Sequence, residues 1–201
     1  MIEILFINPG NAKSIYQDLS KDYSAIETPT WSLLLAESCR SIGHQVSILD
    51  VNAERIDLET SLKKINLINP KIICFVVYGQ NVNAGTTSMS GAVLLSNYLK
   101  SNKVTQPIIY VGSHVQALPV ETLKNEKSID IVLTNEGVYA IRNLLKLENF
   151  SCDNLKNIKG IGYRKNNEVI LNPPEAIVPQ DRMDIDLPGY AWDLLPYNKS
   201  P

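Results

Sequence analysis

Cysteine is scarce in this sequence, and the few cysteines are not spaced like metal ligands. The 201 residues include three cysteines, Cys39, Cys74 and Cys152, and no two of them form a CxxC pair. Such an odd, widely spaced set is typical of a reducing compartment and disfavours disulfides, structural zinc and iron–sulfur clusters. We therefore expect a cytoplasmic protein whose own residues hold no metal.

Long apolar runs and an excess of basic residues are missing too. No apolar run approaches the ~20 residues that a membrane-spanning helix needs. The chain begins with Met1-Ile2-Glu3 and lacks the basic, apolar leader of a signal peptide. The formal net charge is −2 and the pI is about 5.7, whereas nucleic-acid binding needs a basic surface. We expect neither a membrane nor a nucleic acid as partner.

Catalytic motifs are the third absence. No GxGxxG follows the first apolar run, and no Gly-Lys-Ser/Thr of a phosphate-binding loop occurs. A phosphate-accepting receiver domain needs an aspartate after its third strand, where this chain has Val77-Tyr78-Gly79. No Ser–His–Asp or Cys–His arrangement can be placed either. We expect a binding module and no catalytic activity from this chain alone.

What the sequence does contain is a regular alternation of short apolar runs with amphipathic stretches. The runs that predict strands are Glu3–Asn8, Gln45–Leu49, Ile72–Tyr78, Pro107–Val111 and Ile129–Leu133. The stretches that predict helices are Thr30–Ser41, Leu58–Leu67 with Asp57 as N-cap, Met89–Lys100, Pro119–Lys127 and Val138–Lys146. This alternation predicts a doubly wound α/β domain over residues 1–148, Rossmann-like, with a five-stranded parallel sheet in the flavodoxin-like order 2-1-3-4-5.

The pattern changes over residues 149–201. Ile161–Arg164 and Val169–Leu171 flank a polar turn, which predicts a C-terminal β-hairpin. From Pro173 onward the chain is rich in proline and acid and has no period. We expect an extended tail, a linker that is mobile or docked through Trp192 alone.

Polar residues gather where the predicted strands end. Open α/β sheets bind ligands at the carboxyl ends of their strands. The third strand opens there into a loop of amides, hydroxyls and glycines, followed by a helix that we expect to begin after Ser88 as N-cap. The candidate binding residues are Asn52, Tyr78, Gly79, Gln80, Thr86, Thr87, Gly112, Ser113, His114 and Glu136.

Each candidate also has an ordinary structural interpretation, which the sequence leaves open. Gly112 would allow close approach of the backbone to a ligand, or it simply ends a strand. Tyr78 would stack on a ligand or belong to the core. Thr86 and Thr87 would bind a phosphate or amide or precede a helix cap. Glu136 would face the ligand or interact with the dipole of the next helix.

Six segments occur in order along nearly the whole chain and carry a resemblance. They are Ile48–Ala53, Val76–Gln80, Val111–Pro119, Asp130–Gly137, Ile158–Arg164 and Asp186–Pro196. Together they resemble the N-terminal cobalamin-binding domain of cobalamin-dependent radical SAM proteins. In that family Gly-Gly is usual where this chain has Gly112-Ser113, and Gly-Glu-Gly-Glu is usual where it has Asn135–Val138.

The resemblance implies a bound cobalamin and a second domain. Family members continue into a radical SAM barrel with a CxxxCxxC motif, which these 201 residues do not include. S-adenosylmethionine and a [4Fe-4S] cluster are therefore expected only if a radical SAM domain is joined in cis or associates in trans. The resemblance implies that the radical SAM domain would catalyse a methyl transfer or a rearrangement. An excised domain and a stand-alone binding protein both remain open.

The two histidines bear on how cobalt would be ligated. Cobalamin domains of another type carry Asp-x-His-x-x-Gly, whose histidine replaces the lower axial ligand of cobalt. Neither His44 nor His114 lies in that motif. The resemblance then implies a base-off cobalamin without histidine ligation, with its nucleotide along the sheet's edge. A cofactor-free interaction domain and a flavin- or nucleotide-binding flavodoxin-like protein remain the alternatives.

Overall fold

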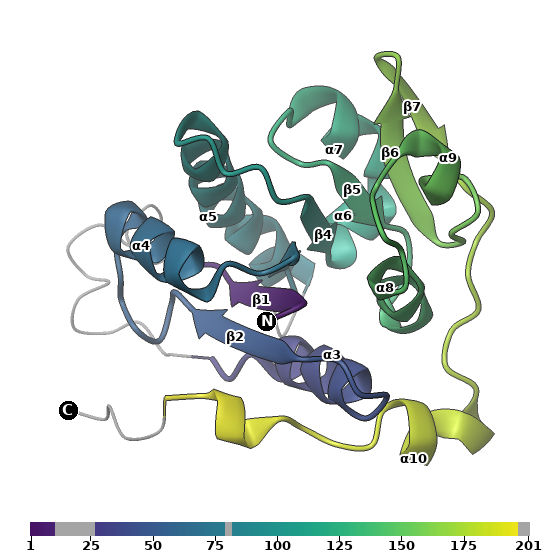
Figure 1. Cartoon of the computed structure of the whole chain (residues 1–201), viewed down its shortest axis with the longest axis horizontal. Coiled ribbons are helices and arrows are strands. Elements are labelled where there is room, and N and C mark those ends of the chain that lie inside the picture. Colours follow the sequence, from purple (N-terminus) through teal and green to yellow (C-terminus); the bar gives the residue numbers. More distant parts are fainter. Residues whose placement is uncertain (11–26, 79–81, 197–201) are drawn as a thin grey trace.

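A twisted sheet flanked by helices forms the protein (Figure 1). The structure is a computed structural model that describes residues 1–10, 27–78 and 82–196. Five parallel strands make its centre: β1 (Ile4–Asn8), β2 (Val46–Asp50), β3 (Ile72–Val76), β4 (Ile108–Val111) and β5 (Ile131–Leu133). They lie in the order β2-β1-β3-β4-β5, the order predicted for these five strands.

The predicted number of strands in the sheet is wrong, because the described residues form a sheet of seven strands. β6 (Ile161–Lys165) pairs antiparallel with β5, and β7 (Glu168–Leu171) pairs antiparallel with β6. The turn between them places Asn166 and Asn167 at φ angles of 51° and 68°, as a tight two-residue turn requires. The sequence pattern carries no signal for the edge that a hairpin joins, and here the pair extends the main sheet.

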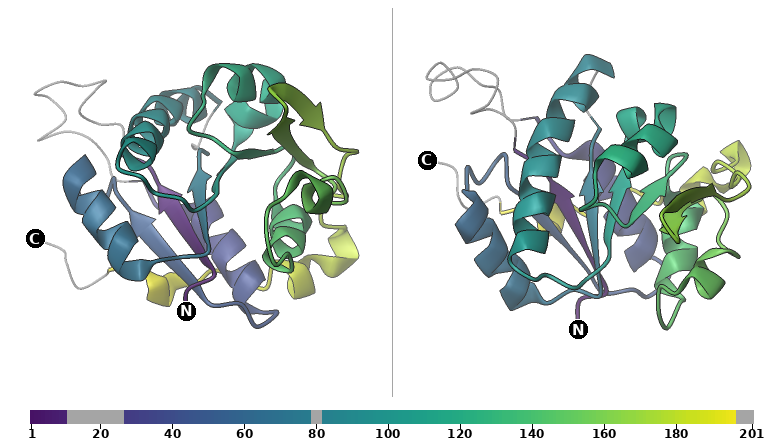
Figure 2. Two further views of the ribbon diagram at one scale, coloured as in Figure 1. Left: turned by 45° about the horizontal axis from the view of Figure 1, so that its top comes forward. Right: turned by 90° about the horizontal axis from the view of Figure 1, so that it is seen from above.

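Helices cover both faces of the sheet (Figure 2). One face packs against α3 (Thr30–Arg40), α8 (Val138–Leu145) and the short α9 (Cys152–Leu155). The other packs against α4 (Leu58–Ile68), α5 (Val82–Ser101), α6 (Ser113–Ala117) and α7 (Pro119–Asn125). Alternate strand residues face the two cores, since β1 sends Ile4 and Phe6 to the first and Leu5 and Ile7 to the second.

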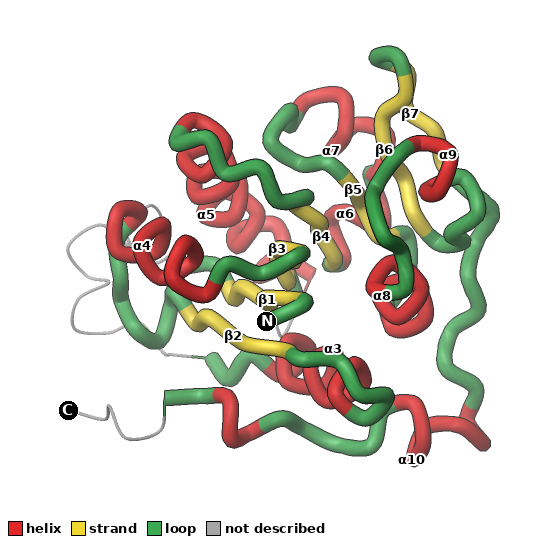
Figure 3. Tube along the Cα trace, viewed as in Figure 1, coloured by secondary structure: helices red, strands yellow, loops and turns green. Residues whose placement is uncertain are grey.

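Two helix starts are informative (Figure 3). The Asp57 carboxylate accepts the Thr60 backbone N–H at 2.8 Å, so α4 has the predicted N-cap. The predicted N-cap of α5 is wrong, because the helix begins at Val82 and Ser88 lies inside it. A run of small polar residues resembles a loop in sequence, but here its backbone is helical.

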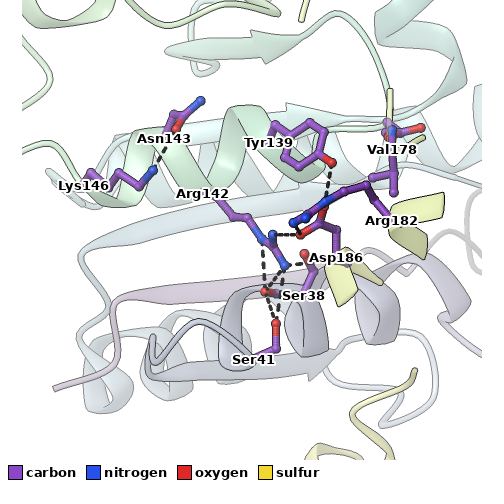
Figure 4. A network of polar contacts seen from close by, with 10 residues as sticks. Ser38, Ser41, Tyr139, Arg142, Asn143, Lys146, Val178, Arg182 and Asp186 are labelled. Carbon is purple, nitrogen blue, oxygen red and sulfur yellow. Dashed lines mark hydrogen bonds and ion pairs between the residues drawn. The ribbon is translucent and has the colours of Figure 1, made fainter. Parts of the chain in front are cut away.

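The tail after β7 crosses the outer side of α3 and α8. It contains two 3₁₀ turns, Gln180–Arg182 and Trp192–Leu194, on either side of α10 (Met183–Asp186). The Asp186 carboxylate points inward and accepts a hydrogen bond from Arg142 Nη1 at 2.6 Å and from the Tyr139 hydroxyl at 2.6 Å (Figure 4). Only 2% of Asp186 and 7% of Arg142 are exposed. A buried ion pair therefore anchors the tail.

Other contacts extend this anchor on both sides. The Arg142 guanidinium also donates to the Ser38 carbonyl of α3 at 2.9 Å. Further along, the Ala191 N–H donates to the Leu33 carbonyl, and Arg40 pairs with Asp193 at 2.7 Å. Trp192 stays 45% exposed. The expectation that the tail docks through Trp192 alone is wrong, because Asp186, Ala191 and Asp193 also contact the domain. The sequence did not indicate the Asp186 contact, since no local pattern marks a carboxylate that faces inward.

Replacing Asp186 should detach the tail. Asp186→Asn leaves the Arg142 guanidinium buried without its counter-charge, which should lower the free energy of unfolding by about 3 kcal/mol at pH 7. Hydrogen bonding to Arg182, Tyr139 and Arg142 holds the pKa of Asp186 below its ordinary value. The stabilisation is thus present above the ordinary carboxyl pKa of about 3.9 and is lost as pH falls through the folded-state pKa.

The measurement is urea unfolding of the wild type and the variant from pH 7 down to pH 3. Asp184→Asn is the matched control, since Asp184 is exposed on the same helix. We expect a large Asp186→Asn effect at pH 7 that shrinks below about pH 4, and almost none for the control. Equal stabilities of wild type and Asp186→Asn at pH 7 would contradict this account of the tail.

Candidate functional site

The carboxyl ends of the five parallel strands meet at one edge of the sheet, here called the carboxyl edge. β1 and β3 are neighbours, and the helices that follow them, α3 and α5, cover opposite faces. The chain thus leaves this pair of strands in opposite directions, which creates a topological switch point. Ligands of open α/β sheets bind at such a point, so the topology directs attention to the residues that follow β1, β2, β3, β4 and β5.

At the end of β2 the Asp50 carboxylate has a structural role. It is buried and accepts hydrogen bonds from the Asn8 side chain and the Ala53 N–H, both at 2.9 Å. Burial raises the pKa of Asp50, and these hydrogen bonds oppose the rise. The turn that they hold presents Asn52, half-buried, at the carboxyl edge.

At the end of β3 an aromatic pair lies beside the switch point. The Tyr78 ring stacks on Trp31 of α3, with ring centroids 4.8 Å apart and planes 23° from parallel. The Tyr78 hydroxyl accepts a hydrogen bond from the Gln116 side chain of α6. Burial raises the pKa of Tyr78 to about 12, so this phenol is protonated throughout the neutral range.

At the end of β4, Gly112 lies against the backbone of β3. A Cβ at Gly112 would lie 2.2 Å from the Val77 carbonyl oxygen, far inside contact distance. The strands stay paired up to this point, since the Val77 N–H donates to the Val111 carbonyl at 2.7 Å. This contact between the strands explains why the residue is glycine, and the explanation needs no bound ligand. Ser113 and His114 follow in α6, a short helix that is not among the predicted elements.

At the end of β5 two side chains hold the tail. The Asn135 side chain accepts the Gly137 N–H at 3.0 Å and donates to the Glu175 carbonyl at 3.2 Å. The Glu136 carboxylate accepts the Val178 N–H. Glu136, a candidate for ligand binding, therefore already has a partner within the chain.

The remaining candidates lie at the β3–α5 connection. Gly79 and Gln80 lie outside the described residues. Thr86 and Thr87 belong to α5, but their side chains also lie outside the described part of the structure. We expected both threonines in a loop before the helix, and their position within α5 corrects that.

Three candidates have polar side chains that can receive a ligand. Asn52, Ser113 and His114 are half-buried, and within the described residues their side chains form no hydrogen bond. An amide, a hydroxyl and an imidazole at one edge of the sheet supply both donors and acceptors. These groups can form hydrogen bonds with the polar groups of a ligand.

Sequence reasoning missed Trp31, Gln116 and Asn135. Trp31 belongs to α3, and its stacking on Tyr78 is visible only in three dimensions. Gln116 and Asn135 meet because β4 and β5 are adjacent, and the Gln116 side chain donates to the Asn135 carbonyl at 2.7 Å. Only their place after a strand end, inside segments that carry the family resemblance, could have indicated them.

Comparisons with known proteins agree on the fold. No family model matches the sequence. The cobalamin-dependent S-adenosylmethionine radical enzyme OxsB, solved with aqua-cobalamin and S-adenosylmethionine bound, aligns with 96% of this chain at a TM-score of 0.69 and 16% identity. The radical S-adenosylmethionine methyltransferase TsrM from Kitasatospora setae aligns with 87% of it at 0.64 and 14% identity. Both of these structural neighbours are radical SAM enzymes, and OxsB is cobalamin-dependent.

The chain is also similar to one segment of longer proteins. An uncharacterized methyltransferase of Pyrococcus horikoshii is 28% identical over 156 residues, which are 78% of this chain and 32% of that protein. The chain covers 24% of OxsB and 30% of TsrM. It thus corresponds to about a quarter to a third of the length of each of these proteins.

Clusters of metal-ligating side chains and helices that could cross a membrane are both absent from the described ranges. No group of three or more histidine, cysteine or acidic residues there is placed to hold a metal ion. Burial raises the pKa of Cys39 to about 12 and raises that of Cys74 as well. Among the described helices, none combines the length and apolar character that crossing a membrane requires.

The glycine at the end of β4 gives the sharpest test of this edge. In Gly112→Ala the new methyl group would overlap the Val77 carbonyl, and close-packed strands cannot relieve such overlap cheaply. We expect a loss of at least about 3 kcal/mol in the free energy of unfolding, measured by urea denaturation.

Gly43→Ala is the matched control. Gly43 has a φ of +96°, and no atom lies within 4 Å of the point that an alanine methyl group would occupy. Alanine there adds backbone strain without overlap and should cost about 1–2 kcal/mol. Equal losses for the two variants would show that overlap with Val77 is not the reason for Gly112.

Proposed function

We propose that this chain is a cobalamin-binding module that holds base-off cobalamin at the carboxyl edge of its sheet. One observation carries the proposal: 96% of the chain shares its fold with an enzyme solved with aqua-cobalamin bound. The topology supports it independently, because the order β2-β1-β3-β4-β5 creates a switch point where such sheets bind ligands.

The chemistry of the carboxyl edge suits this ligand. Cobalamin carries amide side chains around its ring and a phosphate in its nucleotide, so it needs many neutral donors and acceptors. Asn52, Ser113 and His114 supply such groups without a competing partner among the described residues. Tyr78 adds a phenol fixed by stacking, and Gly112 brings two strand ends close together.

The proposed site also includes residues that follow β3 and β5 in the sequence. We include Gly79 and Gln80, which follow β3 in the sequence, and Thr86 and Thr87, which belong to α5. Glu136 belongs to the same edge, and its contact with Val178 ties the tail to it. Cobalamin would supply a cobalt centre for a methyl transfer or rearrangement, and this chain would supply its binding.

The base-off form is proposed from the two histidines. His44 precedes β2 at the opposite edge of the sheet, where its ring contacts the Glu3 carboxylate at 3.0 Å. His114 lies at the carboxyl edge but outside an Asp-x-His-x-x-Gly motif. We therefore propose that neither histidine replaces the nucleotide base on cobalt, and that His114 contacts the periphery of the cofactor.

The proposed partner is a radical SAM domain, joined in cis or associated in trans. The longer neighbours support this, since the chain matches only 24% and 30% of their lengths. S-adenosylmethionine and a [4Fe-4S] cluster would belong to that domain. Within the chain, residues 1–148 would bind the cofactor, and residues 149–201 would lead toward the partner.

The two histidines allow a test with an internal control. Hydroxocobalamin titrated into the wild type should give a saturable change in its visible spectrum, and reduced bound cobalamin should lack the electron-paramagnetic splitting caused by an axial nitrogen. His114→Ala should weaken binding by about tenfold, roughly 1.4 kcal/mol, because it removes a polar contact at the carboxyl edge. His44→Ala, at the opposite edge, should bind like the wild type.

Each part of the proposal has its own contradicting result. Absence of binding by the folded wild type would refute the function. Equal effects of His114→Ala and His44→Ala would refute the assignment to the carboxyl edge. A nitrogen splitting that disappears in His114→Ala would refute base-off binding without histidine, since His114 would then be the axial ligand.

A further inference from the structure

Gln116 connects two strand ends that the sequence keeps apart. Its side-chain amide donates to the Tyr78 hydroxyl after β3 and to the Asn135 carbonyl after β5, the latter at 2.7 Å. An amide group has two hydrogens, so these two bonds use its full donor capacity. Gln116 itself is half-buried on α6, between the two acceptors. Its donors are committed, and it is not a free surface group.

The bond from Gln116 decides what the Tyr78 hydroxyl can do. That oxygen accepts from Gln116, so its own hydrogen remains available for donation to another group. Stacking on Trp31 fixes the plane of the ring, with the centroids 4.8 Å apart. The ring plane and the acceptor side of the hydroxyl are therefore both set by the protein. What remains is one hydrogen-bond donor of fixed position at the carboxyl edge.

We propose that Gln116 is a positioning residue that orients the Tyr78 hydroxyl to donate a hydrogen bond to an amide or phosphate oxygen of cobalamin. This inference rests on the proposed function and assigns a role to a residue outside the candidate set. The phenol suits the role, because burial keeps it protonated at neutral pH. The bond to Asn135 fixes the amide in turn, and Asn135 is itself held against the tail at Glu175.

A double-mutant cycle on cobalamin affinity tests the role. Tyr78→Phe removes the hydroxyl but keeps the ring that stacks on Trp31, and Gln116→Leu removes the amide at similar volume. Each should weaken hydroxocobalamin binding by about five- to tenfold. Because Gln116 acts through the Tyr78 hydroxyl, the double variant should have the same hydroxocobalamin affinity as the single variant with the lower affinity.

Gln116→Glu sharpens the test. A carboxylate can only accept, so it would take the Tyr78 hydrogen that the ligand needs, and binding should weaken at least as much as in Gln116→Leu. Gln106→Leu is the matched control, because Gln106 is a glutamine near the opposite edge whose side chain donates to Asn69 at 3.0 Å. It should bind hydroxocobalamin like the wild type.

The outcomes separate this inference from the proposed function. If the wild type binds and Gln116→Leu binds equally well, the positioning role is refuted and the function stands. A Gln116→Leu variant that unfolds at lower urea but keeps its affinity also refutes it, since Gln116 would then be a structural brace. If the losses of binding free energy in the two single variants add up in the double variant, Gln116 does not act through Tyr78. A folded wild type that binds no cobalamin refutes both.

Discussion

The close approach of Gly112 to the Val77 carbonyl holds the ends of β3 and β4 together, and the carboxyl edge depends on it. With no Cβ at Gly112, the two strands remain paired to their last residues, where the Val77 N–H meets the Val111 carbonyl at 2.7 Å. Tyr78 and α6 follow directly from these ends. Their proximity lets Gln116 reach the Tyr78 hydroxyl and links the switch point to the end of β5.

The tail belongs to the same packed unit. Burying a guanidinium and a carboxylate is costly unless each finds its partner, so the Arg142–Asp186 pair favours one docked position of the tail over others. At the other end of this segment, Asn135 and Glu136 hold residues 175–178 at the carboxyl edge. Hydrogen bonds therefore link Tyr78, through Gln116 and Asn135, to the backbone of the tail segment that precedes α10.

The sequence predicted what depends on local pattern. Buried parallel strands are continuous apolar runs, so β1 to β5 and their order followed from the sequence, as did the Asp57 cap. Contacts between distant residues were not predictable: Arg142 meets Asp186 across 44 positions, and β6 joins β5 without a local signal. At the carboxyl edge, strand ends indicated Tyr78 and Gly112, but their partners Trp31, Gln116 and Val77 needed the fold.

The central claim is that cobalamin lies at the carboxyl edge, and hydrogen exchange measured with and without hydroxocobalamin tests it most directly. The account predicts slower amide exchange on binding at residues 76–78, 111–118 and 133–137, which follow β3, β4 and β5. Residues 44–46 and 104–108, at the opposite edge, should exchange at unchanged rates. Protection confined to the opposite edge, or bound cobalamin without any change at the carboxyl edge, would contradict the account.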